Sequence, residues 1–250
     1  MTSSPLFSRV DYALSALSTL ACLTLFLPFA NVGVDVHHDG LMLKPALDVL
    51  DGQVLHRDTF TQYGPLTTLI HAGLMGIFGE RLLVLRVATV VAESVAIGLF
   101  TLAWRSLMPW RVILAIVLLW CCLPYFYQGM AALHPWSSSL AMLFQSACFL
   151  SMAVALRAPG QSLRIATIAA AGVCASATFW CRQPVGGLLA MAGASIPIAM
   201  RLRGDGLPSG SLGRTVALTV MNPYLQAYLL GRHWIRPGDA RLAHKQGRIG

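Results

Sequence analysis

Acidic and histidine residues gather in one short stretch of this chain. Seven of its twenty-eight Asp, Glu, Lys and Arg residues lie between Asp35 and Asp58, and His37, His38 and His56 are interleaved with them. A carboxylate can act as a general base, and imidazole and carboxylate groups can hold a metal ion. The chain as a whole is 56% hydrophobic and 11% charged, so this stretch is where water, ions and substrate can meet protein. We take it as the candidate active site.

The composition of the whole chain is that of an integral membrane protein. Its mean hydropathy is +0.65 and its charged fraction is less than half of the roughly 25% usual in soluble domains. The basic residues stand singly or in pairs at the ends of apolar runs, which is a membrane topology pattern and not a nucleic-acid patch. The expected partner is therefore the lipid bilayer. The six cysteines show no C-x-x-C spacing, and neither a disulfide framework nor a cysteine zinc site is indicated.

The apolar runs predict an all-α, polytopic fold. A helix of about 20 apolar residues crosses the bilayer core, and six or seven such helices are expected in one transmembrane domain, residues 1–230. The expected spans are residues 12–31, 82–104, 112–127, 135–156, 165–180, 185–200 and, as the seventh, 215–230. The first run exceeds the ~7–15 residues of a signal-peptide core, which favours an uncleaved span over a signal peptide.

The polar stretch leads into two short helices. Between turn signals at residues 39–40 and 51–52, leucines recur at helical spacing. This spacing predicts an amphipathic helix on the membrane surface, with Asp48 and Asp51 on its solvated face. The apolar run 66–78 is too short to span a bilayer and predicts an interfacial or re-entrant helix.

Topology follows from that short helix. If residues 66–78 do not cross, the basic residues that flank the spans fall on one side: Arg105, Arg111, Arg157, Arg164, Arg201, Arg203 and Arg214. The positive-inside rule then places the N-terminus in the cytoplasm of a bacterial-type inner membrane and the catalytic loop, residues 32–79, outside. Residues 231–250 are basic without an apolar run, which favours a disordered tail or a non-native ending left by truncation or a frame change.

The order of these features resembles the polytopic glycosyltransferases of the GT-C fold, which use polyprenyl-phosphate-linked sugars. Those proteins are similar in placing an acidic motif after the first span, then an amphipathic helix ending in Gly, then a Pro-Leu element that opens a juxtamembrane helix. The matching pieces are Asp35-Val-His-His-Asp39-Gly40, residues 46–52, His56-Arg-Asp58, Tyr63-Gly-Pro-Leu66, Phe78-Gly79 and Arg86. The resemblance covers about residues 10–105. The chain departs from it at Gly40, where many members have a second acid, and in the doubled His37-His38.

The resemblance implies an inverting transfer of a sugar from a polyprenyl-phosphate donor to a glycan, lipid or protein acceptor outside the cytoplasm. It implies that Asp39, with Asp35 next, is the general base on the acceptor hydroxyl. Cations near the loop can neutralise the donor phosphate. The residues expected to bind substrate are His38, Lys44, Arg57, Asp58, Tyr63 and Arg182. The cofactor is unknown; for a divalent metal ion, the candidate ligands are His37 and Asp39.

Other interpretations stay open at this point. The carboxylates of the loop could simply face solvent. Arg86 and Glu93, inside the second span, are interpreted as structural residues, each with a partner in the bundle interior. His134, beside Trp136 on the same face of the membrane as the loop, could line a sugar pocket, but a structural role is preferred. The alternative class of protein is a transporter or flippase-like protein, and a third alternative is an inactive truncated fragment of a glycosyltransferase.

Overall fold

The described part of the chain is entirely helical. The computed structural model describes residues 6–105, 107–126, 133–189 and 191, and these contain no β-strand. The helices are α1 (Arg9–Phe26), the 3-10 helix η1 (Leu27–Asn31), α2 (Val36–Leu50), α3 (Pro65–Phe78), α4 (Leu82–Trp104), α5 (Trp110–Phe126), α6 (Ser137–Arg157) and α7 (Gln161–Cys181). The predicted all-α fold is confirmed for this part of the chain.

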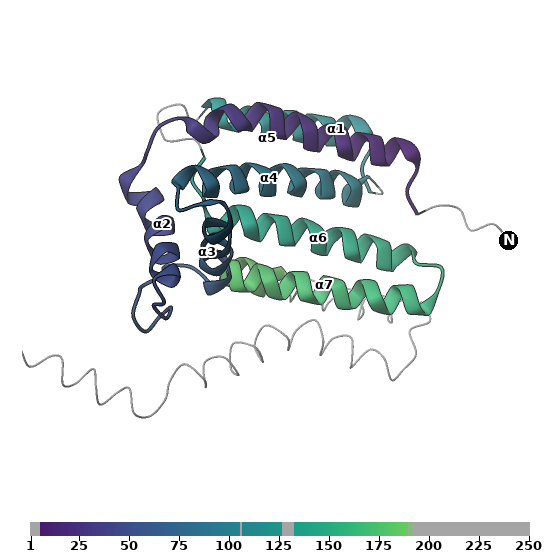
Figure 1. Cartoon of the computed structure of the whole chain (residues 1–250). Coiled ribbons are helices and arrows are strands. Elements are labelled where there is room, and N and C mark those ends of the chain that lie inside the picture. Colours follow the sequence, from purple (N-terminus) through teal and green to yellow (C-terminus); the bar gives the residue numbers. More distant parts are fainter. Residues whose placement is uncertain (1–5, 106, 127–132, 190, 192–250) are drawn as a thin grey trace, which may run out of the picture.

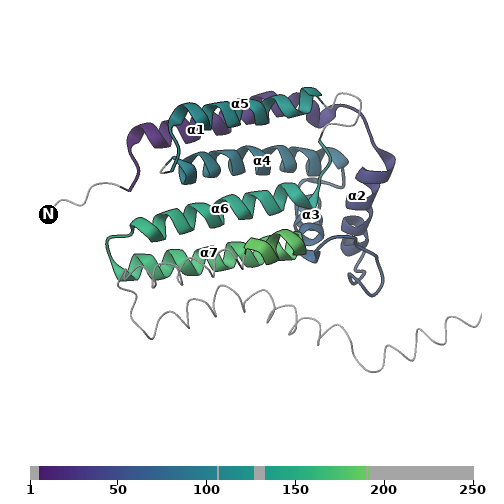
Figure 2. The ribbon, with the colours of Figure 1, turned by 180° about the vertical axis from the view of Figure 1, so that it is seen from behind.

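The long helices form one bundle with two short helices across its end. Helices α1, α4, α5, α6 and α7 lie side by side in both views, while α2 and α3 run transversely at one end (Figures 1 and 2). Helix α4 is central, because it packs on both α1 and α6. The transverse position of α3 fits its sequence, which is apolar but only 14 residues long.

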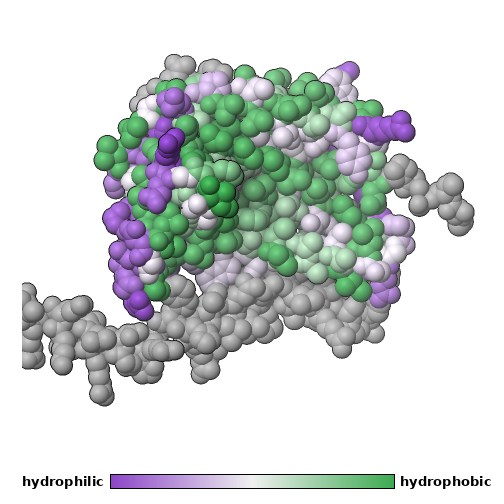
Figure 3. Space-filling view, in the orientation of Figure 1, coloured by the Kyte–Doolittle hydropathy of each residue, from purple (hydrophilic) through white to green (hydrophobic). Residues whose placement is uncertain are grey.

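Four helices of the described residues are long and apolar enough to cross a membrane. They are α1 together with η1, α4, α6 and α7, whereas α3 and the apolar part of α5 are shorter. Hydrophobic side chains cover the flank of the bundle and hydrophilic ones gather toward its two ends (Figure 3). These features define an integral membrane protein. The expected total of six or seven spans is not reached here; the span 215–230 and the tail 231–250 lie outside the described residues, as does most of 185–200.

Successive long helices of the bundle run in opposite directions. Basic residues therefore meet at the end of the bundle opposite to α2 and α3. Arg105, after the last turn of α4, pairs with Asp11 in the first turn of α1, with 3.0 Å between Nε and Oδ1. Arg157, at the end of α6, lies 5.4 Å from the ring of Phe7. This is the clustering of cations expected if α3 does not cross the membrane.

Helix α2 begins earlier than the sequence predicted. A turn was expected at residues 39–40, but both lie in the first part of the helix. The reason is a reciprocal cap. The Asp35 carboxylate accepts the backbone N–H groups of His37 and His38, each at 3.0 Å, and the Asp39 carboxylate accepts the N–H of Asp35. These bonds satisfy donors that a helix N-terminus otherwise leaves unpaired.

The transverse helices are held by a small apolar core and a buried acid. Ala46, Ala72, Met75 and Leu85 join α2, α3 and α4. The prediction that Asp48 lies on a solvated face was wrong: it is 4% exposed and accepts hydrogen bonds from Lys44 and from the Thr59 hydroxyl. Residues beyond α2 fold back over it, which leucine spacing within the helix could not reveal.

The segment before α3 is fastened to the end of α7. The Gly64 N–H donates to the carbonyl of Cys181 at 3.2 Å. A Cβ atom at Gly64 would lie 1.8 Å from the carbonyl oxygen of Trp180, so only glycine fits this contact. The contact holds the polar segment that follows α2 against the C-terminal end of α7.

Candidate functional site

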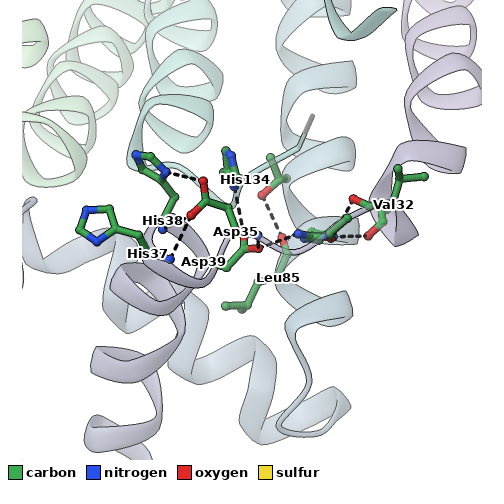
Figure 4. A network of polar contacts seen from close by, with 11 residues as sticks. Val32, Asp35, His37, His38, Asp39, Leu85 and His134 are labelled. Atoms are coloured by element: carbon green, nitrogen blue, oxygen red, sulfur yellow. Dashed lines mark hydrogen bonds and ion pairs between the residues drawn. The ribbon is translucent and has the colours of Figure 1, made fainter. Parts of the chain in front are cut away.

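The site is centred on a buried ion pair between α2 and α4. Arg86 Nη2 lies 2.6 Å from Asp39 Oδ2, and the two side chains are 4% and 3% exposed. Figure 4 shows Asp39 within a network of polar contacts that also includes Asp35, His38 and His134. A buried guanidinium and carboxylate compensate each other's charge, and removing one partner leaves the other buried and unpaired.

Arg86 also fixes the backbone that joins the first span to α2. Its Nη1 donates to the carbonyl oxygens of Gly33 at 2.7 Å and Val32 at 3.2 Å. The sequence prediction that Arg86 and Glu93 each face the interior with a partner is confirmed, because Glu93 accepts a hydrogen bond from Ser139 at 2.7 Å. Arg86 thus sets the position from which Asp35 and Asp39 enter the site.

His134 approaches the same carboxylate from a distant part of the sequence. Its Nδ1 lies 3.2 Å from Asp39 Oδ1, although the two residues are 95 positions apart. The sequence interpretation allowed His134 to line a sugar pocket, but preferred a structural role and left it out of the expected site residues. The available signal was its predicted position at the same end of the bundle as the polar loop, but sequence alone could not show that its ring turns toward Asp39.

Asp35 and His38 form the more exposed half of the network. His38 Nδ1 lies 2.8 Å from Asp35 Oδ2, and the side chains are 38% and 32% exposed. The hydrogen bond from the His38 ring, followed by that from its backbone N–H, lowers the pKa of Asp35 to about 2. Asp35 is therefore ionised at physiological pH and is a weak proton acceptor.

Aromatic rings border this half of the site. The His38 ring centroid lies 4.9 Å from that of Trp136 and 5.2 Å from that of His134. Tyr63, predicted to bind substrate, lies 6.1 Å from Trp136. Arg182, also predicted to bind substrate, follows Cys181, the last residue of α7. The Cys181 carbonyl accepts the N–H of Gly64, which is next to Tyr63 in the sequence. Both therefore lie at the end of the bundle that carries the site.

The remaining predicted site residues lie outside the network. Lys44 pairs with Asp48 at the far part of α2. Arg57 and Asp58 pair with each other through two hydrogen bonds of 3.0 and 2.9 Å, which lower the pKa of Asp58. The ring of His37 is exposed and points away from Asp39 (Figure 4). His37 and Asp39, the candidate metal ligands from the sequence, are not brought together as a pair of ligands.

The chemistry available here is that of carboxylates, imidazoles and a guanidinium at one end of an apolar bundle. Such a set can accept a proton, bind a cation or contact a polar headgroup. Fold and site together define a helical integral membrane protein with a polar site at its end. Searches with protein-family models, curated proteins and solved structures find no match to this chain.

Proposed function

We propose that this protein is a membrane glycosyltransferase. It transfers a sugar from a polyprenyl-phosphate donor to an acceptor outside the cytoplasm, by inverting displacement with an aspartate as general base. The observation that carries the proposal is the meeting of Asp35 and Asp39 with His38 and His134 at one end of an apolar helical bundle. A lipid-borne sugar travels along that boundary between lipid and water, so its reactive carbon can reach such a site.

The resemblance assigns the base to Asp39. Its Oδ2 accepts hydrogen bonds from Arg86 and from the Asp35 N–H, whereas Oδ1 lies 3.2 Å from Nδ1 of His134. A carboxylate oxygen offers about two lone-pair directions, so Oδ1 can serve the acceptor hydroxyl beside His134. The acceptor has to enter next to His134, because the Asp39 side chain is 3% exposed.

The displaced group is a phosphate, and its growing negative charge needs a cation nearby. Arg182, at the end of α7, is the candidate for this contact, because an arginine can bind phosphate through two hydrogen bonds. Helix α3 offers its N-terminal N–H groups at the same end of the bundle. Lys44 and Arg57 are assigned to lipid headgroup contacts, because they project from the exposed segment around α2.

The test is sugar transfer by the purified full chain in lipid nanodiscs, using labelled hexosyl and pentosyl polyprenyl phosphates. We expect transfer by the wild type and a loss of roughly 10²- to 10⁴-fold in Asp39→Asn, the range for a lost general base. Asp51→Asn is the matched control, because Asp51 caps the other end of α2 and is exposed. Its rate should equal that of the wild type.

Two results would contradict the proposal. A folded Asp39→Asn variant with the wild-type rate would remove Asp39 from the base role. A wild-type protein that transfers no sugar from any donor, but moves lipid-linked sugars across a vesicle membrane, would assign the site to a transporter or flippase-like protein.

A further inference from the structure

Three side chains with metal-binding atoms converge at the exposed half of the site. Asp35 and His38 come from the start of α2, and His134 comes from the segment before α6. One ligand atom from each of the three lies within 4.8 Å of the others. This set differs from the pair expected from the sequence, His37 and Asp39.

We propose that Asp35, His38 and His134 bind one divalent transition-metal ion of the Zn²⁺ type. The spacing fits such an ion with small side-chain movements. Ligand atoms that bind one ion at about 2.0 to 2.2 Å lie roughly 3 to 4 Å apart. The Asp35 and His38 atoms are already 2.8 Å apart. Because all three ligand atoms lie within 4.8 Å of one another, a side-chain shift of about an ångström brings them into range of one ion.

The donor set selects the class of metal. Imidazole nitrogen favours Zn²⁺ and its first-row neighbours, whereas Mg²⁺ and Ca²⁺ prefer oxygen ligands. Two imidazoles with one carboxylate therefore favour an ion such as Zn²⁺ or Co²⁺. The two imidazole rings face each other with centroids 5.2 Å apart and an interplanar angle of 39°.

The contact between Asp39 and His134 is an independent observation that favours a metal ion. Asp39 lies 3.2 Å from Nδ1 of His134, which leaves Nε2 of that ring for an ion. A metal-binding histidine usually donates its other N–H to a carboxylate, which orients the ring and makes it a better ligand. Arg86 holds that carboxylate in place from the other side at 2.6 Å. Asp39 is therefore a positioning residue for the metal ligand His134.

Three protein ligands leave at least one coordination position for water or for an oxygen of a bound molecule. If the proposed function holds, a phosphate oxygen of the sugar donor is the natural occupant, because the ion would offset its negative charge. Asp35 would then be a ligand, and Asp39 would remain the carboxylate for the base role. Metal binding itself does not depend on that reaction.

The experiment uses the full chain, purified in detergent and stripped with EDTA. Isothermal titration with Zn²⁺ should give one site per chain, and Co²⁺ should give a visible absorption band. We expect His38→Ala, His134→Ala and Asp35→Asn each to raise the Zn²⁺ Kd by more than the roughly 10- to 100-fold typical of substitutions behind a ligand. His37→Ala is the matched control, and its Kd should equal that of the wild type. Excess Mg²⁺ should not displace Zn²⁺.

Several results would overturn the metal site. Zn²⁺ binding that survives both His38→Ala and His134→Ala, in variants that elute as folded monodisperse protein, would be adventitious binding elsewhere. Loss of binding in His37→Ala would shift the site to the pair expected from sequence. If Zn²⁺ binds as expected but no sugar is transferred from any donor, the metal site stands and the proposed function fails.

Discussion

The ion pair between Asp39 and Arg86 gives the sharpest quantitative prediction. Two unit charges about 4 Å apart interact by about 4 kcal/mol at an effective dielectric constant of 20, and breaking a buried pair typically costs about 3 to 5 kcal/mol. We therefore expect Asp39→Asn to lower the free energy of unfolding by about 3 kcal/mol. Arg86→Gln should cost at least as much, because it also removes the donor to the carbonyls of Val32 and Gly33.

The double variant separates pairing from other effects. Once both charges are removed, neither is left buried alone, so the double variant should lose about 3 kcal/mol less than the sum of the single variants. Unfolding can be followed by tryptophan fluorescence during titration of detergent micelles with SDS. The control is the exposed pair of Arg57 and Asp58, whose side chains are 54% and 36% exposed. Substituting that pair in the same way should give no measurable coupling.

Additive losses for Asp39 and Arg86 would refute the pairing, and with it the account of how the site is positioned. The double variant also sharpens the activity test. The double variant should be about as stable as Arg86→Gln. If it transfers no sugar while Arg86→Gln still does, the loss comes from the missing carboxylate of Asp39 and not from misfolding.

Two further predictions concern α3. Burial lowers the pKa of His71 from 6.5 to about 4, so below pH 6.5 the unfolded chain binds a proton that the folded chain does not. Stability should therefore fall between pH 6.5 and 4, by up to roughly 3 kcal/mol, and His71→Leu should remove this component in pH-dependent unfolding. Gly64→Ala should cost at least the ~1 to 3 kcal/mol of overpacking, whereas Gly73→Ala, with open space around it, should be neutral or stabilising in the same unfolding assay.

Much of the fold followed from hydrophobic periodicity, which is a local property. Four long apolar runs became α1, α4, α6 and α7, and the 14-residue α3 was expected not to span a membrane. The predicted start of α2 was wrong by several residues, because the pair Asp39-Gly40 has the composition of a turn. The reciprocal cap of Asp35 and Asp39 overrides that local preference.

The sequence by itself determined that this is a helical membrane protein whose chemistry-bearing residues gather between Asp35 and Asp58, because transfer of apolar side chains from water depends on composition and spacing alone. Only the tertiary structure decided which of those residues meet and which residues from elsewhere in the chain join them. Arg86 and His134 reach Asp39 from 47 and 95 positions away, and the buried Asp48 accepts a hydrogen bond from Thr59, 11 positions away. Such contacts depend on how helices cross and on how rings turn, which no local pattern encodes.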